Sequence, residues 1–224
     1  MAVAYRSGAQ TNFSSSTTLT LTEPAGAAEN DILIAAVYHE AGAGVTITPT
    51  ASWNLIHRID QASGGPITCA VYWFRRAGTA PSYVFTMSSS TIVAGGVVAY
   101  SGAITTGDPQ DVTASTNSST GSVTITCNTI TTSTANSMII GVASSFDFVA
   151  MSSASFANER LDADADKATV FYDDGLLVTP GATGNKTITR SSGTTAWTGS
   201  LIALKPPAVG GSTPSISTML MMGV

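Results

Sequence analysis

The sequence predicts an all-β protein, most simply a single jelly-roll-like β-sandwich of about twelve strands built from two duplicated halves. Three observations support this prediction. Short runs of β-branched and aromatic residues recur along the chain, separated by clusters of Gly, Pro, Asn, Asp and Ser. Only 10% of the residues are charged against 43% hydrophobic, so Ser and Thr supply most of the polarity. Finally, the first half of the chain recurs weakly in the second.

The repeat keeps one register over several segments. Residues 18–22 match 124–128, and residues 30–37 match 136–143, both at an offset of 106. Two later pairs have slightly smaller offsets, namely 83–88 with 186–191 and 94–101 with 198–205. The shared register defines two halves, about 15–102 and 120–206, and argues against coincidence.

Each half contains six strand-like runs that end at turn-forming residues. In the first half they lie near 17–22, 31–38, 53–60, 67–76, 82–88 and 93–100. In the second they lie near 122–127, 137–144, 157–162, 167–173, 185–190 and 197–204.

The connection between the halves bears on how they combine. Residues 102–121 are long and loop-like but lack the dense Pro and Gly of a hinge. The turn at Asp108-Pro109, followed by Asp111-Val112, suggests a chain that crosses from one sheet to the other. We therefore favour one β-sandwich domain over residues 1–206, with two tandem Ig-like sandwiches as the alternative. Residues 207–224 form a Pro/Gly linker and an apolar tail.

Composition excludes several classes of function. A net charge of −5 and a pI near 4.7 leave no basic stripe for nucleic acid. No apolar run is long enough to span a membrane, and the first residues lack a secretory signal, so assembly in a cytoplasm is expected. Cys69 and Cys127 are the two thiols; we expect them to be reduced, with a disulfide as the open alternative.

Catalysis is not predicted. The chain has no G-x-S-x-G elbow, and its acidic residues are concentrated in one loop rather than paired across a cleft. His57 alternates with Leu55 and Ile59, which favours a buried or edge histidine over a general base, and His39 has no distinctive partners. We expect no enzyme activity and no cofactor, apart from a weak calcium signal described below.

Three motifs carry a resemblance. They are Trp53-Asn-Leu-Ile, then residues 94–102 leading into Gly107-Asp-Pro-Gln-Asp-Val112, then residues 196–206. Over residues 15–206 the chain resembles a largely uncharacterised group of β-sandwich structural proteins of tailed bacteriophages and prophages. The resemblance implies a virion component and leaves head, tail and fibre open. It brings no catalytic residues with it.

Two apolar segments are candidate contact surfaces. The run 67–76 has apolar residues on both faces, including Tyr72, Trp73 and Phe74, so its second face needs cover from this chain or a partner subunit, or serves as a sugar-stacking platform. The tail ends in Met219, Leu220, Met221 and Met222. This tip either folds back on its own domain or docks into a neighbouring subunit.

Charged residues supply two further candidates. Arg75 and Arg76 close the fourth strand of the first half, while Asp173 and Asp174 close the corresponding strand of the second, which suggests head-to-tail packing between subunits. The alternative is a pair of unrelated exposed turns. The run containing Asp162, Asp164 and Asp166 could supply three oxygen ligands to calcium, although a solvated loop is the more common fate of such a run.

These features predict a non-enzymatic virion structural protein, such as a capsid decoration, tail or fibre component in a symmetric array. Its partners would be other virion proteins and copies of itself, with no nucleic acid and no membrane. One alternative is a carbohydrate-binding or adhesin-like module that attaches to a surface glycan. The other is a self-polymerising filament subunit linked by the tail.

Overall fold

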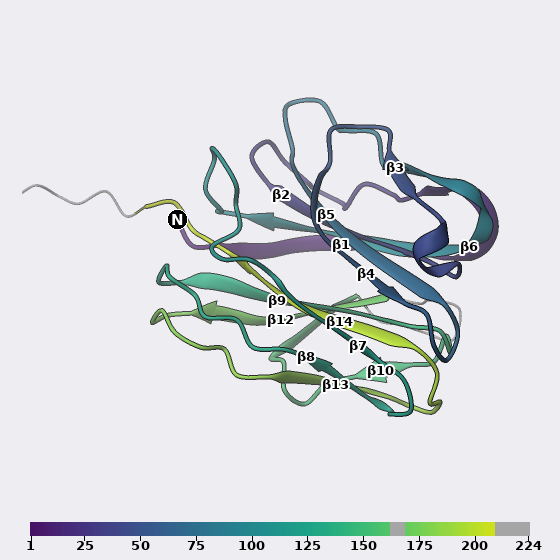
Figure 1. The fold of residues 1–224 in the computed structure, drawn as a ribbon. Helices are drawn as coiled ribbons and strands as arrows, with labels where there is room; N and C mark the ends of the chain where they lie inside the picture. Colours follow the sequence, from purple (N-terminus) through teal and green to yellow (C-terminus); the bar gives the residue numbers. More distant parts are fainter. Residues whose placement is uncertain (162–168, 209–224) are drawn as a thin grey trace, which may run out of the picture.

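The computed structural model describes residues 1–161 and 169–208 (Figure 1). Within these residues the chain forms fourteen strands and one short 3-10 helix, η1 (Gly42–Gly44). The strands are β1 (Ala4–Thr20), β2 (Ile32–His39), β3 (Ile47–Pro49), β4 (Asn54–Gln61), β5 (Ile67–Arg75), β6 (Val84–Ser101), β7 (Ser115–Ser119), β8 (Thr124–Cys127), β9 (Ser137–Ser145), β10 (Met151–Ser152), β11 (Asn158–Leu161), β12 (Thr169–Leu177), β13 (Lys186–Arg190) and β14 (Trp197–Leu204). The predicted all-β class is confirmed.

The first half forms one antiparallel sheet that folds over on itself. Its order is β1-β6-β2-β5-β4, and β3 pairs with the far end of β6. The paired strands β1 and β6 are long and change register at bulges, one of them between Thr11 and Ser14, so they pass from one layer to the other (Figure 1). Leu33, Trp53, Tyr72 and Phe85 lie in the apolar core enclosed between these layers.

The second half forms two separate sheets. One has the order β11-β12-β9-β14-β7, and the other has the order β10-β13-β8. Ile125, Ile188, Trp197 and Leu201 belong to the core between them. This half is therefore a sandwich in its own right.

The two halves share one strand order. The path β1-β6-β2-β5-β4 corresponds to β7-β14-β9-β12-β11, and the layer made by the ends of β1 and β6 with β3 corresponds to β8, β13 and β10. Asn30 and Asn136, 106 residues apart, both adopt positive φ, of 69° and 60°, just before β2 and β9. Asn tolerates this left-handed conformation better than most residues do, so the turn chemistry is repeated as well as the strands.

The halves pack face to face through a third apolar core. Strands β2, β5 and β6 of the first half contribute Ile34, Val71 and Val98, while β9 and β12 of the second contribute Ile140 and Phe171. The two sheets that face each other across this core, one from each half (Figure 1), thus have apolar residues on both faces. This explains why β2, β9 and β14 are buried at every position instead of alternating between buried and exposed residues.

The arrangement of the halves corrects one expectation. Among the described residues, every ladder joins strands of the same half, so the strands do not interleave in a jelly roll. The expected sheet-to-sheet crossing at 102–121 is instead a connection between two sandwiches, as in the tandem alternative. The apolar core between the halves makes them one body.

Several strand boundaries also differ from the predictions. The predicted runs 82–88 and 93–100 are one continuous strand, β6, and the run 17–22 covers only the end of β1. β3, β7 and β10 are additional. These three are short, and β7 consists of Ser, Thr and Asn without apolar alternation, so no periodic signal marks it.

Candidate functional site

The aromatic strand β5 is covered from within the chain. Tyr72 is 5% exposed and lies with Phe74 against the core of the first half. Trp73 points the other way, toward the core between the halves. Cover from within the chain therefore accounts for the face that carries Tyr72, which corrects the sugar-stacking alternative for that ring. Trp73 is half-buried, and the same alternative stays a prediction for it.

The two arginines after this strand bind groups of their own chain. The Arg75 guanidinium donates from Nη2 to the carbonyl oxygens of Ile104 and Gly107, each at 3.0 Å, and lies 5.6 Å from the centre of the Trp73 ring. Arg76 pairs with Glu23 at 2.7 Å. Both arginines help to fix the loops at this end of the first half.

Asp173 and Asp174, expected to meet the arginines of another subunit, differ in their exposure. Asp173 is fully buried, so the prediction that it contacts another subunit is corrected. Asp174 pairs with Lys186 at 2.6 Å within the same half. Strand pairing shows that Asp173 corresponds to Trp73, because they pair with the equivalent residues Ile140 and Ile34. Asp173 is therefore not the counterpart of Arg75.

Asp173 belongs to a buried polar cluster that joins the halves. Arg160 on β11 binds its carboxylate through Nε at 2.6 Å and Nη2 at 3.2 Å, and Asn158 donates to it at 2.9 Å. From the first half, the Tyr100 hydroxyl donates to Asp173 at 3.2 Å, and the Tyr5 hydroxyl donates to the Arg160 carbonyl at 3.3 Å. Burial and the nearby carboxylate raise the pKa of Tyr100, so its phenol stays protonated and can donate. No sequence motif marks this cluster, because Tyr5 and Tyr100 are far along the chain from Arg160 and Asp173.

Two groups of predicted site residues lie outside the described residues. They are the candidate calcium ligands Asp162, Asp164 and Asp166, and the apolar tip Met219, Leu220, Met221 and Met222. Elsewhere, in residues 1–161 and 169–208, no group of three or more His, Cys, Asp or Glu side chains is arranged to hold a metal ion. In the same residues, no helix has the length and apolar character to cross a membrane.

The histidines and cysteines are held in the interior of the protein. Burial lowers the pKa of His57 to about 4, and burial together with Arg58 lowers that of His39 to about 4. Cys69 lies in the core between the halves and Cys127 in the core of the second half, both as free thiols. Burial raises their pKa values to about 11 and about 12, so both stay protonated at neutral pH.

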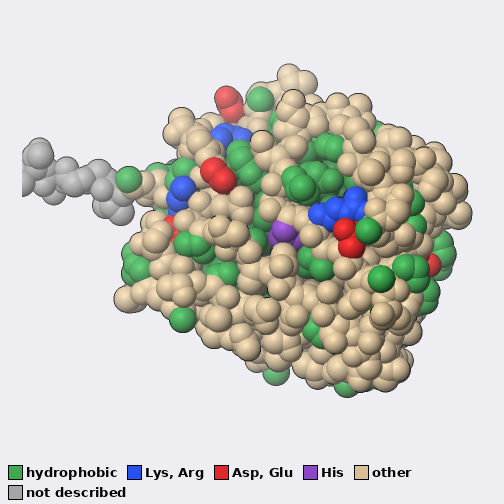
Figure 2. All heavy atoms as spheres, viewed as in Figure 1, with side chains coloured by type: hydrophobic (Ala, Val, Ile, Leu, Met, Phe, Trp, Pro, Cys, Tyr) green, Lys and Arg blue, Asp and Glu red, His purple; other side chains and the backbone are tan. Residues whose placement is uncertain are grey.

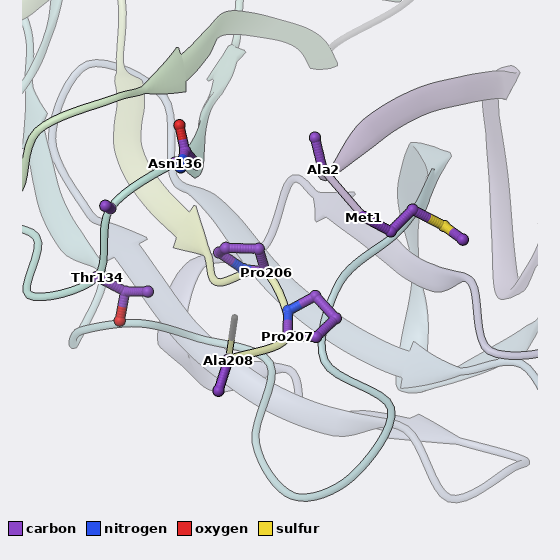
Figure 3. A pocket seen from close by; sticks show the side chains of 8 residues that line it. Met1, Ala2, Thr134, Asn136, Pro206, Pro207 and Ala208 are labelled. Carbon is purple, nitrogen blue, oxygen red and sulfur yellow. The ribbon is translucent and has the colours of Figure 1, made fainter. Parts of the chain in front are cut away.

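A largely apolar pocket lies where β14 ends. A pocket of about 530 Å³ is lined by Met1, Ala2, residues 134–136 and residues 206–208. Figure 3 shows Pro206 and Pro207 between the first residues of the chain on one side and Thr134 and Asn136 on the other. Pro206 is buried, whereas Ala208 is exposed. Residues 206–208, the last that the structure describes, thus form part of the wall of this pocket.

The surface around these features has few charges. In the face seen in Figure 2, most of the visible atoms are backbone or uncharged polar side chains, with a small number of Lys, Arg, Asp and Glu. This agrees with a chain in which 10% of residues are charged. Comparisons with family models, curated proteins and solved structures find no match to this chain.

Proposed function

We propose that this protein is a non-enzymatic virion structural component that assembles in a symmetric array through its C-terminal tail. The observation that carries the proposal is the anchoring of the tail. Strand β14 lies in the middle of its sheet, between β9 and β7, and Leu204 at its end belongs to the core between the halves. The residues that follow line the open pocket. Any partner that binds the tail is therefore coupled to the rigid centre of the molecule.

The tail has the composition of a docking peptide. Residues 209–214 are rich in Gly and Pro, and Met219, Leu220, Met221 and Met222 follow. An extended chain of this length reaches about 50 Å, enough to contact a neighbouring subunit. Unbranched Met side chains adapt to irregular apolar grooves. Host cytoplasm would be the place of assembly and the virion the final location.

The hydroxyl-rich body suits a repeated particle component. Its outer strands carry Ser and Thr, so neighbouring copies can approach without strong charge repulsion. The resemblance to structural proteins of tailed bacteriophages and prophages supports the same role. Other virion proteins and further copies of this chain are the proposed partners.

Light scattering after size-exclusion chromatography tests the proposal. We would compare the full chain with a chain that ends at Ala208, because Pro206 is buried and should be kept. The full chain should form a closed oligomer, and the truncated chain should be monomeric. Replacing residues 219–222 with Ser should have the effect of the truncation, whereas replacing Ser215 and Ser217 with Ala should have none.

Two results would count against the proposal. Equal masses for the full and truncated chains would exclude tail-mediated assembly. A mass that grows without limit as concentration rises would favour the filament alternative, because heterologous contacts that do not close produce open polymers.

A further inference from the structure

The seam between the two halves is closed on one side and open on the other. On the closed side, β11 lies against β1 and β6, and the Tyr5 ring and Arg160 fill the space between them. On the open side, β4 lies against β7 and β14 (Figure 1). Here a groove of about 500 Å³ is lined by Ile56, Lys205 and residues of the segment 108–113.

The internal repeat explains the difference. Asn54 pairs with Trp73 in the first half, and Asn158 pairs with Asp173 at the equivalent place in the second half. In both halves the register shifts shortly after the asparagine. The residue two positions after each asparagine is therefore equivalent, so Ile56 is the counterpart of Arg160. In the second half, Gln110 forms a β-bridge to Leu204. In the first half, Tyr5 pairs with Tyr100, which is the residue equivalent to Leu204. Gln110 is therefore the counterpart of Tyr5.

The two counterparts on the open side are the smaller side chains. Ile replaces Arg, and Gln replaces Tyr. The neighbouring positions differ as well, because Leu204 corresponds to Tyr100 and Trp73 corresponds to Asp173. The groove lies beside Ile56 and Gln110.

The wall of the groove is held by backbone hydrogen bonds. The amide of Lys205 donates to the carbonyl of Pro109 at 3.0 Å, and the amide of Asp111 donates to that of Ala203 at 2.9 Å. The Asp111 carboxylate accepts from the amide of Ser133 at 2.7 Å and from that of Thr134 at 3.1 Å. The groove is therefore preformed, which lowers the entropic cost of binding a ligand.

The remaining polar groups point to a neutral, hydroxyl-rich ligand. The Lys205 ammonium has no ion-pair partner within the described part of the chain. The Gln110 amide nitrogen makes only long contacts of 3.4 Å with the Asp108 carboxylate, and its oxygen and the exposed Thr113 hydroxyl supply further polar groups. Asp108 and Asp111 in the same lining disfavour an anion. Ile56 and Val112 offer aliphatic surface.

We propose that this groove is a saccharide-binding site. Sugar hydroxyls would bind Lys205, Gln110 and Thr113, and the C–H faces of the ring would contact Ile56 and Val112. The site does not depend on tail-mediated assembly, because none of its residues belongs to the tail. A virion component with such a site would contact a surface glycan directly.

NMR of the full chain labelled with ¹⁵N tests the site. Glucose, galactose and N-acetylglucosamine would be titrated separately, with acetate and inorganic phosphate as anionic probes. At least one sugar should shift amide signals of residues 108–113 and of β4 in a saturable manner. Lys205→Met and Thr113→Val should each weaken binding about three- to tenfold, the loss of one hydrogen bond.

Two matched variants sharpen the test. Thr116→Val changes an exposed Thr on β7 outside the groove and should leave binding unchanged. Gln110→Tyr rebuilds the side chain of the closed seam and should abolish binding in a folded protein.

Three results would overturn the proposal. In the first, no sugar in the panel shifts these amides. In the second, the sugar-induced shifts persist in Gln110→Tyr. In the third, acetate or phosphate binds more tightly than every sugar, which would make the groove an anion site.

Discussion

The guanidinium of Arg160 lies 4.4 Å from the centre of the Tyr5 ring, across the seam between the two halves. The same guanidinium is paired with Asp173, which is fully buried. Since Tyr5 and Tyr100 come from the first half and Arg160 and Asp173 from the second, the cluster joins the two sandwiches by polar contacts as well as by apolar packing.

Removing the arginine should destabilise the whole protein. In Arg160→Met, the Asp173 carboxylate would remain buried without its cationic partner, which costs about 3 kcal/mol or more in the free energy of unfolding. Urea denaturation followed by tryptophan fluorescence would measure this loss. A single transition should persist, because the apolar core still couples the halves.

A surface pair provides the control for Arg160. Arg76 binds Glu23, whose side chain is 34% exposed, so Arg76→Met should cost much less than Arg160→Met. The double variant Arg160→Met, Asp173→Asn should recover part of the stability lost in Arg160→Met, because no buried charge is left unpaired. Equal losses for Arg160→Met and Arg76→Met would contradict the assigned role of the cluster.

Gly95 is required by close packing of two strands. A Cβ at this position would lie 2.5 Å from the carbonyl oxygen of Ala36 on β2 and 2.9 Å from the Leu19 side chain. Gly95→Ala should therefore destabilise the protein by about 2 kcal/mol or more. Gly44→Ala is the matched control, because nothing lies within 4 Å of its Cβ position, and it should change the thermal midpoint little. Similar midpoints for the two variants would show that β2 and β6 can separate at low cost.

Both thiols should be unreactive in the native protein. Burial raises the pKa of Cys69 to about 11 and that of Cys127 to about 12. An unperturbed cysteine has a pKa near 8.5 and is partly thiolate at about pH 8, whereas these two thiols stay protonated at that pH. A thiol-specific chromogenic reagent should label neither residue before unfolding and both in concentrated denaturant. Rapid labelling of one thiol in native buffer would reveal local opening of the core that contains it.

The repeated strands could be predicted because each carries a local signal. The apolar run at 31–38 and its counterpart at 137–144 coincide closely with β2 and β9. The arrangement of the halves could not be predicted in the same way. A strand that is apolar on both faces must be covered twice, but periodicity does not say whether a second sheet, a loop or another subunit provides the cover.

The candidate sites were harder to predict than the fold. Tyr72 and Trp73 are conspicuous in the sequence because they are aromatic, yet Tyr72 is a core residue and Trp73 is half-buried against the core between the halves. Ile56 and Gln110 lie in motifs that carry the resemblance, but those motifs assign them no role, and the groove that they line is visible only in the folded chain.

Stability should fall as the pH drops from about 6.5 toward about 4. Burial lowers the pKa of His57 to about 4, and burial and Arg58 do the same for His39, whereas an unfolded histidine titrates near 6.5. Within this window the unfolded chain binds more protons than the folded one, so the free energy of unfolding decreases as the pH falls.

The expected loss is about 1 to 3 kcal/mol per histidine. Urea denaturation at several pH values would measure it. His57→Gln should flatten the slope, whatever its effect on absolute stability. The pKa of Asp60 is lowered by its hydrogen bonds to Arg58 and Thr68, so its contribution is lost mainly below about pH 4, outside the histidine window. An unchanged slope in His57→Gln would mean that His57 is hydrated in the folded protein.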